Sequence, residues 1–390
     1  MKPRIVILGG VGAMGRITAR DLVRTGRGKL EVVVADRDPA PEPEPGVEYV
    51  SVDITDPSSL ERVLGGAYAV IASLPYQLNL PAMHGALATG AHYVDLGGLF
   101  HVTRQQLELA PEFERKGIMA LLGMGSAPGI INVLAVHAAR DLEVVREVHC
   151  LVGAVDHTKY RNVPPLGFGY SPDTLLDEYV MPSAVFRRGE FGMVPALDPG
   201  ERIAVRFPKP IGRLVVDSTL HSEVATLPLH FASRGVREVT FRQAFDPAFR
   251  DKVQFVVELG LADTTARNGG KSPRQMLIEL LGRFPAMERI GKPARYEVLR
   301  ALVRGKCRGR AVTVAADCHA GPRAGWGIGP DIDTGAPPSI AVQLMLSGEI
   351  PLRPGVWAPE QIVPVAPLIR ELERRGMRVT RRAQATSVKR

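Results

Sequence analysis

The chain has 390 residues, of which 45% are apolar and 23% charged, which is enough for a substantial core and for two domains. No apolar run reaches the roughly 18 residues of a membrane span, and the N-terminus enters a strand directly, so we expect a cytoplasmic protein with no membrane contact and no signal peptide. The three cysteines lack CxxC spacing, which argues against a disulfide framework and against a bound metal.

The net charge of +8 raises the question of nucleic-acid binding. Much of the excess lies at the C-terminus, in Arg374, Arg375, Arg378, Arg381, Arg382, Lys389 and Arg390. Elsewhere basic residues alternate with acidic ones, which is typical of a solvated surface, and no nucleic-acid-binding motif is present. We therefore expect residues 381–390 to form a flexible basic tail, and we expect no nucleic-acid partner.

The chain begins with a glycine-rich turn between a strand and a helix. Residues 4–8 are branched and apolar, as in a buried parallel strand, and residues 13–25 predict the helix. The GxGxxG turn between them allows the backbone to approach a pyrophosphate, towards which the helix directs its first N–H groups. The cofactor would contact Gly10, Gly12, Ala13, Met14 and Gly15. This context predicts a dinucleotide site, the alternative being a glycine-rich loop in some other α/β unit.

The residues after the next two strands indicate which dinucleotide binds. Asp36 closes the strand at residues 30–35, where a carboxylate accepts hydrogen bonds from the ribose and repels the 2′-phosphate of NADP. Arg37 beside it could instead stack on the adenine or pair with that phosphate. We therefore expect NAD, with NADP as the alternative. Asp53, after the strand at residues 47–52, would face the adenine unless it is only a turn residue before the next helix.

Three further strands, at residues 68–72, 92–96 and 118–122, alternate with helices at 80–89, 107–116 and 130–140. In an open parallel sheet, the loops that follow the strands line the ligand crevice. The loop after the first of these strands would lie beside the nicotinamide ribose, and the glycine-rich loop after the third heads a helix that could bind an anion. These two loops supply the further candidates for cofactor binding, Ser73, Leu74, Pro75, Asn79, Gly125 and Pro128.

The pattern changes near residue 147. Strands are predicted at residues 148–155, 202–207, 213–217, 236–244, 253–261, 296–305 and 308–316, with one clear helix, at 273–283, among them. The expected fold class is α/β: a Rossmann-like doubly wound parallel sheet with an inserted α+β domain built on a mostly antiparallel sheet. Because helices at 339–347 and 365–375 are expected to return to the first domain, that domain would comprise residues 1–128 and 335–380. The substrate and dimerisation domain would comprise residues 129–334.

Six stretches in order along the chain resemble the saccharopine dehydrogenase family, and within it the bacterial L-lysine 6-dehydrogenases. They are VILGGVGAMG at residues 6–15, SLPYQLN at 73–79, HYVDLGG at 92–98, GSAPGIINVLA at 125–135, PPLGFGYSPDTLLDEY at 164–179 and PGVWAPEQIV at 354–363. Gly97 and Gly98 point away from the carboxynorspermidine and saccharopine branches of the family. The resemblance implies a homodimer of Rossmann and inserted sheet domains, which moves hydride between NAD or NADP and an amine carbon of an amino acid.

Such a reaction needs a base, because a proton must leave the ammonium before the hydride leaves the carbon. The first catalytic candidate is Asp95, at the end of a predicted strand, either as the base or as the electrostatic partner of the developing iminium; a turn or capping role is the alternative. The second is Tyr76, which could orient the reacting groups unless its loop is merely exposed. His92 and His101 could relay a proton, although packing and surface roles are common for lone histidines.

The candidates for substrate binding are Gln77, Gly97, Gly98, Lys159, Tyr170, Thr219 and His221. The α-carboxylate of an amino acid needs a cation, which Lys159 or Arg161 could provide; ordinary surface charge is the alternative for both. Two other functions remain open. One is a saccharopine-type enzyme that joins or cleaves an amino acid and a keto acid, and the other is a regulator that binds NAD without catalysis.

Overall fold

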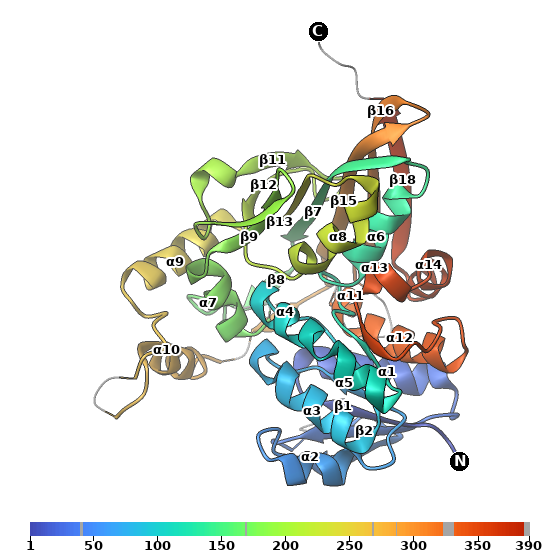
Figure 1. Ribbon diagram of the computed structural model, residues 1–390. Helices are drawn as coiled ribbons and strands as arrows, with labels where there is room; N and C mark the ends of the chain where they lie inside the picture. The colour runs from blue at the N-terminus through green and yellow to red at the C-terminus, as the bar shows by residue number, and fades with distance from the viewer. Residues whose placement is uncertain (40–41, 168–169, 267–268, 286, 323–330, 386–390) are drawn as a thin grey trace.

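The computed structural model describes residues 1–39, 42–167, 170–266, 269–285, 287–322 and 331–385. Two sheets organise the chain: a seven-stranded parallel sheet in the lower part of Figure 1 and a nine-stranded sheet in its upper part, with helices around and between them. The predicted α/β class, with a Rossmann-like sheet and a second, mostly antiparallel sheet, is confirmed.

The parallel sheet has the strand order β17-β6-β5-β4-β1-β2-β3. Its strands are β1 (Arg4–Leu8), β2 (Glu31–Asp36), β3 (Val47–Ser51), β4 (Ala69–Ala72), β5 (His92–Asp95), β6 (Met119–Leu121) and β17 (Gly355–Trp357). Ile5 and Ile7 pack into one apolar cluster and Val6 and Leu8 into another, so both faces of the sheet are covered at β1. The strand order reverses between β1 and β4, and open α/β sheets bind ligands in the crevice at such a reversal.

Short helices connect these strands. They are α1 (Ala13–Gly26), α2 (Pro57–Leu64), α3 (Asn79–Thr89), α4 (Phe100–Glu108) and α5 (Ala110–Lys116), with a 3₁₀ turn η1 (Tyr76–Leu78) after β4. The single helix predicted at residues 107–116 is therefore two helices, because Pro111 suits the first turn of a helix and cannot continue an earlier one. In the described part of the chain no helix is long and apolar enough to cross a membrane.

The second sheet is built on β7 (Val144–Asp156), β15 (Arg295–Cys307) and β16 (Arg310–Ala320), which run antiparallel to their neighbours except where β7 pairs in parallel with β13 (Glu238–Gln243). Its other strands are β9 (Ser183–Arg187), β10 (Glu190–Val194), β11 (Ile203–Arg206), β12 (Arg213–Ser218) and β18 (Arg378–Ala385). Helix α6 (Ile130–Ala139) packs against β15 and β16. A separate two-stranded sheet joins β8 (Lys159–Arg161) to β14 (Glu288–Ile290).

The strand predicted at residues 253–261 is wrong, because residues 253–258 lie in helix α9 (Pro247–Glu258) and residues 259–261 form the turn that follows it. The Asp246 side chain accepts from the Phe249 N–H over 3.0 Å, and Pro247 takes the first helical position, so a helix starts here. Val253 and Val256, three residues apart, are the buried pair. The helix predicted at residues 273–283 is present as α10 (Pro273–Leu281). Two helices that were not predicted, α7 (Pro172–Val180) and α8 (Glu223–Phe231), also occur between the strands of this part of the chain.

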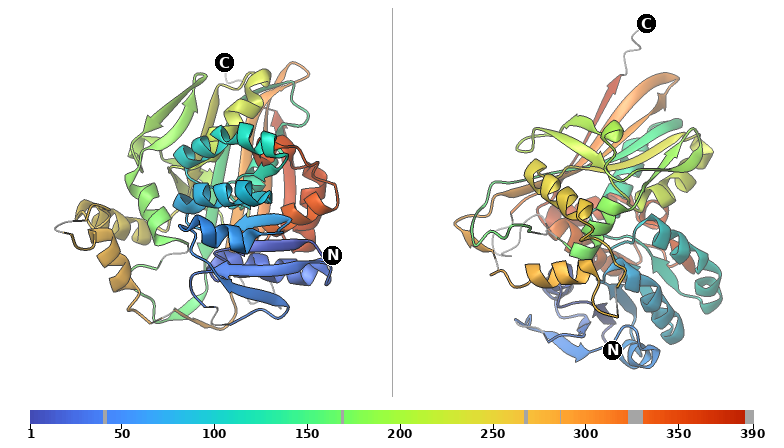
Figure 2. Two further views of the ribbon diagram at one scale, coloured as in Figure 1. Left: turned by 60° about the horizontal axis from the view of Figure 1, so that its bottom comes forward. Right: turned by 90° about the vertical axis from the view of Figure 1, so that its left-hand side faces the viewer.

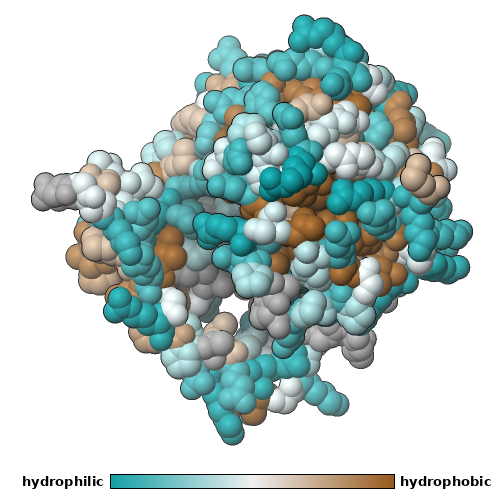
Figure 3. Space-filling model, turned by 90° about the horizontal axis from the view of Figure 1, so that it is seen from below, coloured by the Kyte–Doolittle hydropathy of each residue, from teal (hydrophilic) through white to brown (hydrophobic). Residues whose placement is uncertain are grey.

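Helices α9 and α10 project as an arm on the left of Figure 1, and the left-hand view of Figure 2 also shows them standing away from the Rossmann sheet. The arm exposes the large apolar side chains of Phe255, Leu259, Met276 and Leu280. Figure 3, seen from below, shows this face of the molecule hollowed between the arm and the rest of the chain.

The predicted tail at 381–390 is also wrong over its first part, because residues 381–385 belong to β18, which pairs with β16 along its length. Residues 386–390 lie outside the described residues. The basic charge has a structural use: the Arg381 guanidinium donates to His137 O over 3.0 Å and to Ala138 O over 3.1 Å. These carbonyls end α6, where a cation satisfies free acceptors and complements the helix dipole.

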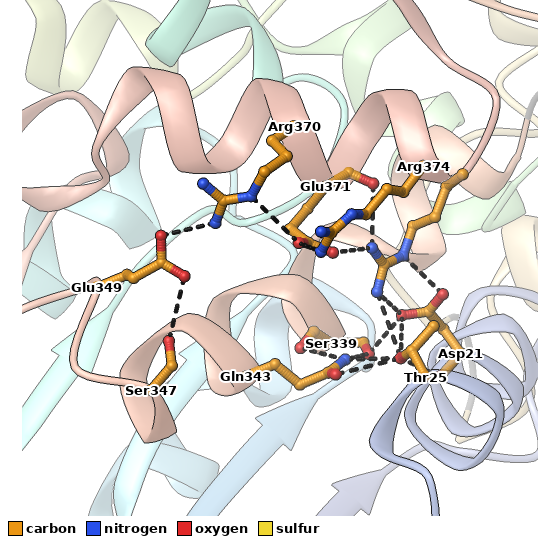
Figure 4. Close-up of polar contacts among 10 residues, drawn as sticks. Asp21, Thr25, Ser339, Gln343, Ser347, Glu349, Arg370, Glu371 and Arg374 are labelled. Carbon is orange, nitrogen blue, oxygen red and sulfur yellow. Dashed lines mark hydrogen bonds and ion pairs between the residues drawn. The ribbon is translucent and has the colours of Figure 1, made fainter.

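The C-terminal helices α11 (Ile332–Gly335), α12 (Pro337–Leu346), α13 (Pro359–Ile362) and α14 (Val365–Arg374) follow the second sheet in the chain, and α11 and α12 pack on α1. Asp21 of α1 is fully buried, and Arg375 donates to its two carboxylate oxygens over 2.7 Å each. Figure 4 shows the network around Asp21, in which Ser339 donates to it over 2.6 Å and Gln343 donates to Thr25 over 2.8 Å. A paired and hydrogen-bonded buried charge of this kind fixes how the last helices meet the first.

Candidate active site

The glycine turn after β1 lies against the ends of both neighbouring strands. The Gly9 N–H donates to Ala35 O over 2.9 Å, and the Ser73 N–H donates to Leu8 O over 2.9 Å. A Cβ on Gly15 would lie 2.5 Å from Gly9 O, so only glycine lets α1 pack this closely on the turn. The loops after β1, β2 and β4 therefore meet at the crevice where the strand order reverses.

Gly12 has a different role in this turn. A Cβ there would meet only Gly9 O, at 3.2 Å, among the described residues, and its φ of −64° suits any residue. The space beside it is therefore open, and the first N–H groups of α1, at Ala13 and Met14, border it. A pyrophosphate binds at such a helix N-terminus. Gly10 packs the turn on β2, since a Cβ there would come within 2.7 Å of a β2 side chain. The turn fits a dinucleotide as GxGxxG predicts.

Asp36 stands at the end of β2, where the ribose is expected. Its Oδ2 accepts from the Val11 N–H of the glycine turn over 3.0 Å, and Oδ1 accepts from the Asp38 N–H over 3.4 Å. The Arg37 side chain is 83% exposed and lies 3.6 Å from the Asp38 carboxylate. The carboxylate is thus fixed beside the turn, while the guanidinium is largely in solvent.

Asp53 is engaged within its own turn. Its Oδ1 accepts from the Thr55 N–H over 2.8 Å and from the Thr55 hydroxyl over 2.7 Å, and these bonds lower the pKa of this exposed carboxyl. The cap of α2 is instead Asp56, which accepts from the Ser58 N–H over 3.0 Å. The geometry favours the turn role for Asp53 over a contact with adenine.

Asp95 is fully buried and has no free hydrogen-bonding position. Its Oδ1 accepts from the Gly97 N–H over 2.9 Å and from the Gly123 N–H over 2.6 Å. Its Oδ2 accepts from the Tyr93 hydroxyl over 3.1 Å and from Gln106 Nε2 over 2.6 Å. Burial raises the Asp95 pKa, while these four bonds lower it. The arrangement argues against the predicted role as a base and makes Asp95 the anchor of the loops after β5 and β6.

The loops that Asp95 anchors are packed against each other. Gly97 has a φ of +108°, and a Cβ there would lie 2.4 Å from the Pro128 ring. A Cβ on Gly125 would lie 3.1 Å from Leu96 O, and the Asn79 amide donates to Gly97 O over 3.2 Å. Loop packing therefore requires glycine at residue 97. The neighbouring Gly98 lies against α4, since a Cβ there would be 3.4 Å from Val102, and the substrate contacts expected for both glycines stay a prediction.

Tyr76 connects the loop after β4 to the arm. Its hydroxyl donates to Asp177 Oδ2 of α7 over 2.8 Å, and Arg274 of α10 donates to Asp177 Oδ1 over 2.7 Å. All three side chains are buried. Burial and the Asp177 carboxylate raise the Tyr76 pKa, so this phenol keeps its proton at neutral pH. Tyr76 therefore holds the cofactor loop to the second domain.

Of the other candidates, His101 and Gln77 lie beside Tyr76, whereas His92, Lys159 and Arg161 lie away from this contact. His92 is the first residue of β5, at the edge of the sheet opposite the crevice, and its Nδ1 accepts from the Met119 N–H over 3.1 Å. The His101 ring packs edge-on to Tyr76, with ring centroids 5.7 Å apart. Gln77 is exposed, and Lys159 and Arg161 are exposed on β8 of the two-stranded sheet.

The structure brings Tyr170 and Thr219 together around a carboxylate that the sequence analysis did not single out, Glu178 of α7. Tyr170 donates from its hydroxyl to Glu178 Oε2 over 2.7 Å, and the Gln243 amide donates to the same oxygen and, over 3.2 Å, to Thr219 Oγ1. Glu178 is 2% exposed. Burial raises the Glu178 pKa to about 7, although the nearby His221 and these hydrogen bonds lower it.

His221 completes this group. Its Nδ1 lies 2.8 Å from Glu223 Oε2, and its ring stacks on Phe241 with 3.7 Å between centroids. Burial disfavours the charged ring, but Glu223 and Glu178 together raise the His221 pKa. We call Tyr170, Glu178, Thr219, His221, Glu223 and Gln243 the acid–base cluster.

The sequence contained one signal for this cluster. Asp177 and Glu178 are adjacent acids in a helix whose other residues at that level, Leu175, Leu176 and Tyr179, are buried and mostly apolar. Charged residues are rarely buried unless they are paired or functional. Acids inside an apolar helical run therefore mark a site, whereas the partners Arg274 and Gln243 are far away in the sequence and carry no local signal.

The fold and the glycine turn have counterparts among known proteins. Residues 5–121 match the family described as saccharopine dehydrogenase NADP binding domain, and residues 125–377 match the saccharopine dehydrogenase C-terminal domain. Over 104 residues the chain is 31% identical to the L-glutamate-forming, NADP(+)-dependent saccharopine dehydrogenase of Saccharomyces cerevisiae, a stretch that covers 27% of this chain and 21% of that protein.

Two solved structures resemble the whole chain. Apo saccharopine dehydrogenase (L-Glu forming) from Saccharomyces cerevisiae has a TM-score of 0.72 and 18% identity, with 98% of this chain and 100% of that chain covered. Homospermidine synthase from Legionella pneumophila, in complex with NAD, has a TM-score of 0.69 and 14% identity, with 100% and 94% covered. At these identities the two structures establish the fold. Together with the family matches across both domains, they show that this chain belongs to the saccharopine dehydrogenase family of NAD(P)-dependent oxidoreductases.

Proposed function

We propose that the chain oxidises the CH–NH2 or CH–NH group of an amino acid with NAD, as L-lysine 6-dehydrogenase does. The observation that carries the proposal is that the loop after β4, beside the dinucleotide turn, is hydrogen-bonded to the helix that carries the buried Glu178 of the acid–base cluster. Tyr76, on the loop after β4, is hydrogen-bonded to Asp177, and the next residue on α7 is Glu178 of the acid–base cluster. A hydride acceptor and a proton acceptor on one crevice are what amine oxidation requires.

The choice of NAD rests on Asp36. Its carboxylate is fixed at the end of β2 by the Val11 N–H, where it would accept hydrogen bonds from ribose hydroxyls and repel a 2′-phosphate. The bound dinucleotide supplies the hydride acceptor. The protein's part is to hold it through Gly12 and the first turn of α1, with the loops at Ser73, Leu74 and Pro75 beside it.

The test follows NADH and NADPH absorbance with purified protein against a panel of L-amino acids, ω-amino acids and diamines. Turnover with an amine and NAD alone, with release of ammonia, supports oxidative deamination. Turnover that appears only when an amine and a keto acid are both present with NAD(P)H supports the saccharopine-type alternative, which the fold shared with saccharopine dehydrogenase favours. Tight NADH binding without turnover on any of them would identify a regulator.

The homodimer implied by the family resemblance is part of this proposal. Light scattering on the purified chain measures its mass against the 42.2 kDa of one protomer. A mass of one protomer at micromolar concentration would contradict it.

A further inference from the structure

We propose that Glu178 is the base that takes the proton from the substrate's ammonium, an assignment that rests on the proposed amine oxidation. The helix that carries it is fixed at its start: Ser171 caps α7, Pro172 takes the first helical position, and Leu175 and Leu176 are buried in an apolar cluster. Because the apolar side chains hold the helix in one orientation, the side of the helix from which Glu178 projects is fixed as well.

The two carboxylate oxygens of Glu178 are not equivalent. Both hydrogen bonds that reach it from the described residues, from Tyr170 and Gln243, end on Oε2. Oε1 receives no hydrogen bond from the described residues. It is also not one of the fully enclosed polar atoms, so a ligand can reach it. A carboxylate with one oxygen held and the other available is arranged to accept a proton from a ligand.

The two carboxylates that are hydrogen-bonded to the loops after β4 and β5, Asp177 and Asp95, lack this feature. Asp95 has two donors on each oxygen, and Asp177 has Tyr76 on one oxygen and Arg274 on the other. Accepting a proton at either would break an existing charge-assisted hydrogen bond. In the acid–base cluster, Glu223 has His221 on Oε2 and an Oε1 that lacks a partner but is fully enclosed, so Glu178 is the carboxylate of the cluster that a ligand can reach.

The charges around Glu178 suit this role. His221, just before the cap of α8, lowers the Glu178 pKa, and Glu223, the first residue of α8, is paired with His221 and raises it. On α7 itself Asp177 is already paired with Arg274, and Tyr170 is a neutral donor. On α9, which packs against α7, Arg250 lies 3.7 Å from Asp217 of β12. A buried carboxyl that titrates near neutral pH is matched to accept a proton at physiological pH.

The step conserves atoms and charge. The Glu178 carboxylate takes one proton from R–CH2–NH3+, which leaves a neutral amine and a neutral Glu178. The C–H bond of the amine carbon then breaks, its electron pair leaves as hydride to the nicotinamide, and the nitrogen lone pair forms the C=N bond of the iminium. Water adds to the iminium to give an aldehyde and ammonium, and Glu178 returns its proton to solvent.

The experiment compares the parent with Glu178→Gln, with Glu178→Asp, and with Asp173→Asn as the matched control, because Asp173 is a 49% exposed carboxylate on the same helix. For Glu178→Gln we expect turnover to fall by about 100-fold or more, which is the usual worth of a general base. The rise of kcat/KM with pH near neutrality should disappear with it. Glu178→Asp should restore part of the turnover and the pH limb, and the control should keep both.

Two further measurements do not depend on turnover. NADH titration by fluorescence should give the same affinity for Glu178→Gln as for the parent, and infrared difference spectra of the free parent should show a carboxyl band that titrates near neutral pH and is missing from Glu178→Gln. A Glu178→Gln variant within about threefold of parental turnover, or with an unchanged pH limb, overturns the assignment alone. If the parent oxidises no amine in the panel, the proposed function fails, and the assignment that rests on it fails with it.

Discussion

Replacing Asp95 tests whether its carboxylate anchors the loops after β5 and β6 or takes part in the chemistry. In Asp95→Ala the Gly97 and Gly123 N–H groups and the Gln106 amide lose their acceptor. An unpaired buried donor costs about 1–3 kcal/mol, so the variant should lose about 4 kcal/mol of its free energy of unfolding. That is a large fraction of the stability of an ordinary protein.

Asp95→Asn should cost much less. Gln106 Oε1 has no partner in the described structure, so a turned Gln106 amide can accept from the new Asn amide, while the Tyr93 hydroxyl can rotate. The two backbone N–H groups keep an acceptor oxygen and lose only its charge, which amounts to about 2 kcal/mol in all. The folded Asp95→Asn protein should then turn over within about tenfold of the parent.

Urea unfolding followed by circular dichroism measures the first quantity, and turnover well below the unfolding temperature measures the second. An Asp95→Ala variant as stable as the parent would refute the anchoring role. An Asp95→Asn variant of parental stability that loses turnover by 100-fold or more would return Asp95 to the chemistry.

Further predictions concern the cofactor turn, the buried ion pair and pH. Gly12→Val should abolish NADH binding in fluorescence titration with an unchanged melting temperature, whereas Gly15→Val should lower the melting temperature, because its Cβ has 2.5 Å to Gly9 O and no room to move. Asp36→Ala should weaken NAD far more than NADP; a parent that already binds NADP more tightly would contradict this. Arg375→Met leaves a fully buried aspartate unpaired and should cost about 3–5 kcal/mol in urea unfolding, with a loss under 1 kcal/mol refuting the pairing. The Glu178 pKa is raised from 4.5 to about 7, so between these pH values the folded state binds a proton that the unfolded state has lost. The free energy of unfolding should therefore fall by roughly 3 kcal/mol as the pH rises from about 4.5 to about 7, and this fall should be absent from Glu178→Gln.

The parts of the fold that could be predicted are those that the local sequence specifies. The strand Arg4–Leu8, the GxGxxG turn and the helix α1 follow one another in the chain, and the residues of each are enough to predict it. The same holds for Asp36, whose position at the end of β2 follows from the strand alone. By contrast, α9 ends in the residues VQFVVE, whose branched side chains favour a strand, and its cap, Asp246, lies seven residues before them.

The site was harder to predict, because the role of each residue depends on which groups from other parts of the chain contact it. A strand-end aspartate such as Asp95 has the same local sequence whether its oxygens face a substrate or four protein donors. Those donors come from Tyr93, Gly97, Gln106 and Gly123, and only the packed loops reveal that they converge. Residues 381–385 posed the same difficulty, since an exposed basic strand resembles a tail until its partner β16 is known.

The order of strands also bears on how the protein is made. β17 forms one edge of the parallel sheet and β18 one edge of the other, so each sheet receives an outer strand from the last part of the chain. During synthesis, β16 is an edge strand with unpaired backbone groups until the residues of β18 have left the ribosome. Such an edge can pair with other chains. Removing β18, or delaying its release with a bulky C-terminal fusion, should therefore reduce the yield of folded protein even though no residue of the crevice is altered.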